Sequence, residues 1–284
     1  MFLVHRVLHP ATGVSRCCWA RVWSGELELV VARGCALEVY GVVDGCLMLR
    51  CAFRFEASVC DVCCCGRPRG SRDALVLSFA SAKVVLVDVD GADGSLRDLA
   101  LFDLEAGDRG GLGAFAVDDV YDRPFASATA EKAAPVLACA GDGSSAACLA
   151  LGRLLIVPLL CAPGSGSGGD ARADPPAPFV VGGAVQRRGE VPRFFEYLPS
   201  DASRVAVVLG DARGDVPKST RVVVAGVDVA SRRCYVVWAV DGLPPLAQGL
   251  GTLRGGGLVV LFRNSLARIR DGGAPAARCN FPST

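Results

Sequence analysis

The residues best suited to chemistry are four cysteines that fall within six positions, in the sequence Cys60-Asp61-Val62-Cys63-Cys64-Cys65. Cys60 and Cys63 have the C-x-x-C spacing that zinc sites and thioredoxin-like redox centres use. A tetrahedral zinc ion needs four ligands, and the chain contains no second C-x-x-C or C-x-x-H pair. A redox centre would need a strand that leads into a helix, and the surrounding sequence does not have that pattern. We therefore expect these cysteines to lie in an apolar strand, and we predict no metal and no cofactor.

The other cysteines also fall mostly in apolar, strand-like runs, as Cys35, Cys51 and Cys148 do. A free thiol there behaves as a small hydrophobic side chain, so we expect most of the fourteen cysteines to be reduced and buried. The first residues, MFLVHRVLHPATG, place Arg6 and His9 where a signal peptide would be apolar. No apolar run reaches the roughly 20 residues of a membrane helix. The sequence predicts an intracellular protein without a membrane span.

Catalytic patterns are weak. His5 and His9 are the only histidines, and no G-x-S-x-G motif supplies a matching nucleophile. Asp118, Asp119 and Asp122 form a cluster, but loops commonly collect aspartates for turn formation. The chain also lacks a phosphate-binding glycine motif. We predict that the protein is not an enzyme, with a hydrolase that uses one of the histidines as the alternative.

Two groups of arginines are the remaining candidates for a binding site. The chain has 30 basic and 29 acidic residues, and this balance excludes nucleic-acid binding by bulk charge. Contact with RNA phosphate or an acidic partner would have to be local. The candidates are Arg187, Arg188 and Arg193, with Arg67, Arg69 and Arg72 as a second cluster. The alternative for both clusters is an ordinary solvated surface.

The elements that would carry these residues are short strands. Residues 72–90 predict a hairpin, because two apolar runs flank a short break and the second ends at an Asp-Gly turn. We expect Asp73 and Lys83 at its edge, or paired across it. Residues 27–55 divide at two turns into three more strands, an antiparallel meander.

Strands recur at roughly ten-residue spacing along the chain, almost without helical periodicity. Their groups begin near Leu27, Ala57, Val136, Arg193 and Leu246. We therefore predict an all-β fold, an incomplete β-propeller of about four to five blades of four-stranded antiparallel sheets. Residues 1–284 would form one such region. Residues 162–178, rich in Gly, Ser and Pro, would be a flexible surface insertion, and the residues after Ile269 a tail.

Several segments resemble one known family. RDALVLSFASAK, residues 72–83, resembles the R-D-A-L-L-L-S-F-x-x-A-K segment of the largest subunits of the cleavage and polyadenylation specificity factor. His9-Pro10-Ala11-Thr12-Gly13 matches an H-P-x-T-G element of that family. Residues 237–244 are similar to its V-I-W-S-L-x-x-L-P, and residues 255–266 to its G-G-V-L-V-x-A-V-N-S-L. The matches follow the same order in both sequences.

The resemblance implies a nuclear, non-enzymatic scaffold of pre-mRNA 3′-end processing. In that family the first propeller helps to hold a WD-repeat subunit and a zinc-finger subunit that recognise the polyadenylation signal, so contact with pre-mRNA would be indirect. Members are much longer, which implies that this chain is a fragment or a shortened product. The alternative is a sister scaffold, of a cullin ubiquitin ligase in DNA repair or of the splicing machinery.

Overall fold

The computed structural model describes residues 13–67, 72–80, 82–104, 135–150, 152–159, 177–211, 219–253, 255–273 and 275–280. The insertion predicted at 162–178 lies outside these ranges except for its last two residues. His5, His9, Arg69 and the predicted aspartate cluster at 118–122 also lie outside them.

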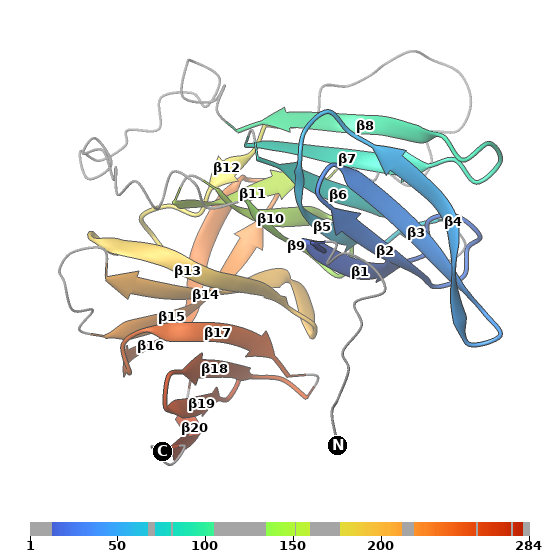
Figure 1. The fold of residues 1–284 in the computed structure, drawn as a ribbon. Helices are drawn as coiled ribbons and strands as arrows, with labels where there is room; N and C mark the ends of the chain where they lie inside the picture. Colours follow the sequence, from blue (N-terminus) through green and yellow to red (C-terminus); the bar gives the residue numbers. More distant parts are fainter. Residues whose placement is uncertain are drawn as a thin grey trace, which may run out of the picture.

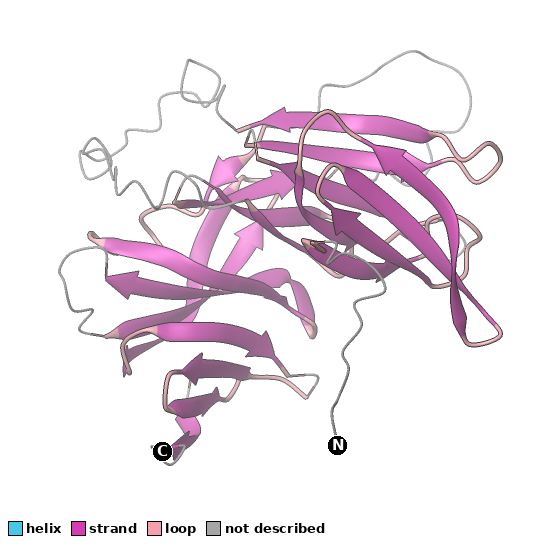
Figure 2. Cartoon of the chain, viewed as in Figure 1, coloured by secondary structure: helices cyan, strands magenta, loops and turns pink. Residues whose placement is uncertain are grey.

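The described residues form twenty strands and no helix (Figure 2). The strands make five sheets of four antiparallel strands, and in every sheet the spatial order follows the chain. The first sheet consists of β1 (Arg16–Ala20), β2 (Glu28–Arg33), β3 (Ala36–Val43) and β4 (Cys46–Arg54), and the second of β5 (Val59–Cys65), β6 (Ala74–Phe79), β7 (Lys83–Val89) and β8 (Leu96–Asp103). The third consists of β9 (Val136–Cys139), β10 (Ser145–Ala150), β11 (Arg153–Pro158) and β12 (Phe179–Val180). The fourth contains β13 (Glu190–Leu198), β14 (Asp201–Asp211), β15 (Thr220–Asp228) and β16 (Arg233–Leu243), and the fifth β17 (Ala247–Thr252), β18 (Leu258–Phe262), β19 (Ser265–Ile269) and β20 (Pro275–Asn280).

The sheets stack face to face in a curved row, with the first and the fifth at its two ends (Figure 1). The first strand of each sheet lies beside the first strand of the next, so β1, β5, β9, β13 and β17 form the inner edge. Within the described residues, extensive packing joins consecutive sheets only. This arrangement is an incomplete, propeller-like all-β fold, as the sequence predicts.

Each pair of neighbouring sheets encloses a hydrophobic core of its own. Val30 and Leu75 belong to the core between the first two sheets, and Val76 and Leu155 to the next. Phe179 and Val207 lie between the third and fourth sheets, and Val208, Val260 and Ile269 between the fourth and fifth. Four separate cores therefore hold five sheets together.

Burial along the strands reflects the position of each sheet in the row. All six residues of β6 are buried, because the second sheet is covered on both faces. In β2 fully buried residues alternate with half-buried ones, which is the pattern of a strand covered on one face. In the sequence of β2, ELVVAR, polar and apolar residues do not alternate in the same way. The outer face of the first sheet thus carries apolar side chains such as Leu29 and Val31, although no other sheet of the described structure covers it.

The sequence-based prediction missed three strands. These are β1, β12 and β20, which belong to the first, third and fifth sheets. The predicted tail after Ile269 was wrong, because β20 pairs with β19 as the fourth strand of the fifth sheet. The prediction that most cysteines are buried was also wrong. Of the thirteen described cysteines, all free thiols, only Cys65 and Cys148 are buried, while Cys35 and Cys46 lie in exposed turn and strand positions.

No helix long and apolar enough to cross a membrane occurs in the part of the chain that the structure describes.

Candidate functional site

Asp61 lies on the inner edge, where the first three sheets meet. It is buried on β5, and its carboxylate accepts hydrogen bonds from the backbone N–H groups of Leu137 (2.7 Å) and Val62 (2.8 Å). The guanidinium of Arg16 on β1 approaches the same carboxylate at 3.5 Å. Burial raises the pKa of Asp61, and the Leu137 N–H and Arg16 partly oppose this shift. Asp61 therefore ties β1, β5 and β9 together.

Asp73 joins the first two sheets in a similar way. Its Oδ2 accepts a hydrogen bond from the backbone N–H of Arg21 (2.8 Å), and its Oδ1 accepts one from the N–H of Arg67 (3.3 Å). The sequence places Asp73 at the edge of the hairpin or opposite Lys83; Asp73 does lie at the end of the hairpin, directly before β6, but the pairing with Lys83 was wrong. Asp73 is buried, and the residue opposite Lys83 is Phe79.

Three thiols lie close to Asp61. Cys63 on β5 and Cys139 on β9 bring their sulfur atoms within 2.7 Å of each other. Burial raises the pKa of Cys18 on β1 to about 12, and Cys139 contributes to this shift. Burial and the hydrogen bond with Cys139 raise the pKa of Cys63 well above its ordinary value. Both thiols are therefore protonated at neutral pH and are weak nucleophiles.

The cysteine cluster of residues 60–65 forms strand β5, as the sequence predicts. Side chains alternate between the faces of this strand, so the cluster is divided between two cores. Within the described residues, no group of three or more His, Cys, Asp or Glu side chains is arranged to hold a metal ion.

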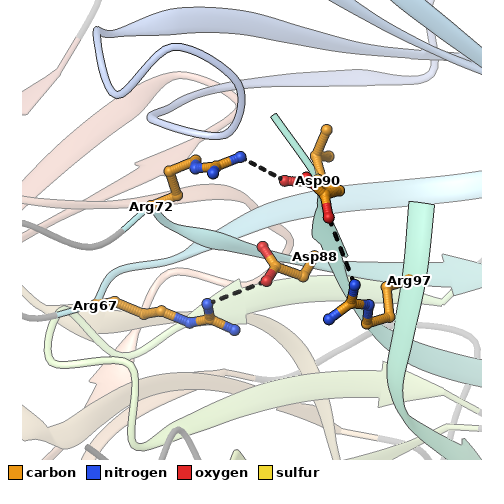
Figure 3. Close-up of a pocket in the computed structure, with 6 residues that line it drawn as sticks. Arg67, Arg72, Asp88, Asp90 and Arg97 are labelled. Carbon is orange, nitrogen blue, oxygen red and sulfur yellow. Dashed lines mark hydrogen bonds and ion pairs between the residues drawn. The ribbon is translucent and has the colours of Figure 1, made fainter. Parts of the chain in front are cut away.

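A hollow lined by arginines lies at the end of β7 (Figure 3). Arg67 contacts Asp88 at 3.4 Å, and Arg97 contacts Asp90 at 3.5 Å. Arg72 donates a hydrogen bond to the carbonyl oxygen of Val89 (3.2 Å). Three positive and two negative side chains leave one net positive charge. The hollow could accept a single acidic side chain or a small anion.

The other arginine cluster lies at the start of β13. Arg187 forms an ion pair with Asp241 (2.8 Å) on β16, and Asp241 also contacts the buried Arg221 (3.3 Å). Arg188 and Arg193 are exposed, and no ion pair of either side chain is found within the described residues. The structure therefore leaves two of the three predicted side chains available to an acidic group and places the third against a carboxylate.

The outer face of the first sheet carries a row of large apolar side chains. Trp19, Leu29, Tyr40 and Leu49 are register partners on successive strands. They alternate with the row of Cys18, Val30, Val39 and Cys51, which packs against the second sheet. Trp19 is 49% exposed and Leu49 is 55% exposed. Val42 and Leu47, also exposed register partners, extend the row. We call these six residues the first-sheet apolar face.

The fifth sheet has a smaller uncovered face. Its apolar side chains are Val259 and Leu261 on β18, whose neighbours on β17 are glycines, and Leu266 on β19, the register partner of Leu261. Leu261 is exposed, whereas Val260 and Ala267, on the opposite side of the same strands, lie in the core with the fourth sheet. Both ends of the row of sheets therefore present apolar surface to solvent.

No known family model matches the chain, and a search of curated proteins finds no match.

Several of these features carry no local sequence signal. In the sequence, Asp61 is only the residue between the cysteines of a cluster. Its hydrogen-bond partner Leu137 is 76 residues away, so no local pattern indicates the contact. The first-sheet apolar face could have been suspected from β2 and β4, whose sequences ELVVAR and CLMLRCAFR lack polar alternation. Which of their faces stays uncovered depends on the position of the sheet in the row.

Proposed function

We propose that the protein is a non-enzymatic scaffold subunit of the pre-mRNA 3′-end cleavage and polyadenylation complex, which acts in the nucleus. The observation that carries the proposal is the first-sheet apolar face. Exposed, contiguous apolar surface on a folded chain is typical of protein–protein interaction sites. Aromatic side chains such as Trp19 and Tyr40 are over-represented among the residues that supply most of the binding energy at such sites.

Two further observations support this function. The propeller-like fold agrees with the architecture that the family resemblance implies. Residues 72–83, which carry the closest resemblance, include β6 and lead into β7, the central hairpin of the second sheet. The resembling segment at 255–266 includes β18 and the turn into β19. The resemblance thus falls on elements that build the sheets, and the exposed apolar face is the surface we propose for binding other subunits.

The proposed partners are the WD-repeat and zinc-finger subunits that recognise the polyadenylation signal. Contact with pre-mRNA would pass through them. Arg188 and Arg193 are available for a supplementary contact with phosphate or with an acidic partner segment, while Arg187 is held by Asp241. A sister scaffold of a cullin ubiquitin ligase or of the splicing machinery would use the same surface with different partners.

Co-expression tests the proposal. The tagged chain is produced with the WD-repeat and zinc-finger subunits, and in parallel with the corresponding cullin-ligase and splicing subunits. We expect the polyadenylation subunits to co-purify. We expect the double variant Leu47→Asp/Leu49→Asp to reduce their recovery at least about tenfold, because it places two charges on the apolar face.

The matched control is the double variant Leu99→Asp/Leu101→Asp, which also places two charges on exposed leucines of one strand. Leu101 lies on the outermost strand of the second sheet and is 57% exposed, close to the 52% of Leu47. This variant should bind like the wild type. Recovery of cullin or splicing subunits instead would establish the alternative scaffold. Recovery of none of the three sets, or equal loss in both variants, would overturn the proposal.

A further inference from the structure

We infer that Cys63 and Cys139 are a redox-sensitive pair that forms a reversible disulfide across the interface of the second and third sheets. Their sulfur atoms are 2.7 Å apart, while a disulfide bond measures about 2.05 Å. Closure thus requires an approach of only about 0.7 Å. Their strands, β5 and β9, are neighbours on the inner edge, so no element has to move to bring the thiols together.

The surroundings keep this pair separate from most other cysteines. Cys63 and Cys139 both pack against the core between the second and third sheets, whereas Cys18 and Cys64 pack against the core between the first and second. Cys60 lies on β5 with its thiol directed at the carbonyl oxygen of Ser58. Cys18 and Cys64 are the competitors, because the pKa of each responds to Cys139.

The oxidant would be a small-molecule disulfide such as oxidised glutathione. One thiolate attacks this disulfide, forms a mixed disulfide and releases one reduced thiol. The second cysteine, also as thiolate, then attacks the protein sulfur of the mixed disulfide and releases the second reduced thiol. Overall, the two cysteines lose two protons and two electrons, and one glutathione disulfide becomes two glutathione molecules. The raised pKa of Cys63 makes the reaction slow at neutral pH and faster as the pH rises.

The disulfide would link the second and third sheets covalently, whereas packing and hydrogen bonds alone hold them together in the reduced protein. The linked cysteines are 76 residues apart in sequence, so the bond closes a long loop and restricts the unfolded chain. In a reducing compartment both cysteines would be free thiols, and the disulfide would form under oxidative conditions.

Mass spectrometry of the full chain tests the pair. The purified protein is equilibrated at a series of oxidised-to-reduced glutathione ratios, free thiols are alkylated, and the protein is digested. We expect one cross-linked peptide pair, two hydrogen atoms lighter than the free peptides, with fragmentation that assigns the bond to Cys63 and Cys139. The oxidised protein should melt at least about 5 °C higher than the reduced protein.

The variants Cys63→Ser and Cys139→Ser should each abolish the cross-link and the shift in melting temperature. Two control variants should retain the cross-link and the shift in melting temperature. These are Cys60→Ser, on the same strand as Cys63, and Cys148→Ser, in the core against which Cys63 packs. The inference is overturned if no cross-link forms at any ratio, if Cys139 pairs with Cys18 or Cys64 instead, or if Cys60→Ser removes the bond. Should a serine variant fail to fold, the assignment in the wild-type protein decides.

Discussion

Single polar residues connect the sheets at every interface. Asp73 accepts the Arg21 N–H between the first two sheets, and Asp61 accepts the Leu137 N–H between the second and third. The hydroxyls of Ser145 and Tyr197 meet at 2.8 Å between the third and fourth, and the hydroxyl of Thr252 donates to Glu196 at 3.3 Å between the fourth and fifth. Apolar cores tolerate small sliding movements, whereas a hydrogen bond requires one alignment. These contacts fix how each sheet lies on the next.

The variant Asp61→Ala tests this role at a buried carboxylate. It leaves the N–H groups of Val62 and Leu137 without their acceptor in a place that water reaches poorly. We expect the free energy of unfolding to fall by about 2–4 kcal/mol, as measured by urea denaturation followed by circular dichroism.

Asp142→Ala provides the comparison for Asp61→Ala. The carboxylate of Asp142 also accepts two hydrogen bonds, from the N–H and hydroxyl of Ser144, but this residue is exposed. Water can replace its contacts, so the loss should stay below about 1 kcal/mol. Equal losses in the two variants would show that Asp61 is an ordinary surface carboxylate.

At the scale of elements, the turns also take part in packing. The turn between β9 and β10 lies against the end of β5, where the Cys65 thiol contacts the carbonyl oxygen of Gly143 at 3.5 Å. Gly143 has φ +71°, and a Cβ at this position would overlap the carbonyl oxygen of Gly66. Both the backbone conformation and the available space therefore require glycine.

Gly143→Ala and Gly152→Ala separate these two requirements. Gly152 also has φ +71°, but no atom lies within 4 Å of the position its Cβ would take. Gly152→Ala should lower the free energy of unfolding by about 1–2 kcal/mol, the cost of the left-handed conformation. Gly143→Ala should cost about 3 kcal/mol or more, because the neighbouring sheet must also shift. Thermal or urea unfolding measures both, and equal costs would show that the turn does not contact the second sheet.

Comparison of the elements with the sequence shows what local patterns can predict. The hairpin of β6 and β7 and the meander of β2 to β4 are local, because their apolar runs and turn residues lie next to each other. By contrast, β1 has the sequence RCCWA, β12 has two residues, and β20 begins with Pro275. Their own residues favour strand weakly, and pairing with a preformed neighbour decides their conformation. The contacts of Asp61 and of Cys63 with Cys139 join distant segments, so sequence spacing could not predict them.

At the scale of the whole molecule, the two end sheets differ from the three between them. The first and fifth sheets share one core each, while the second, third and fourth share two. An array in which each unit contacts only its neighbours is least stable at its ends.

Hydrogen exchange followed by mass spectrometry can measure this difference. The matched positions are the second strands of the sheets, since each has a strand on both sides. We expect the backbone amides of β2 and β18 to exchange faster than those of β6 and β14, because the end sheets open without disrupting a second core. Uniform protection in all four strands would indicate that the five sheets unfold as one unit.

The strict agreement between strand order and chain order has a consequence for synthesis on the ribosome. Each sheet is complete once its own stretch of chain has emerged, and no sheet waits for a strand from a distant segment. At about 5–20 residues per second, roughly 50 residues emerge in about 3–10 s. Each nascent sheet would then dock on the one made before it. Translation itself would thus set the order in which the five sheets assemble, and the first-sheet apolar face would form before the four sheets that follow it.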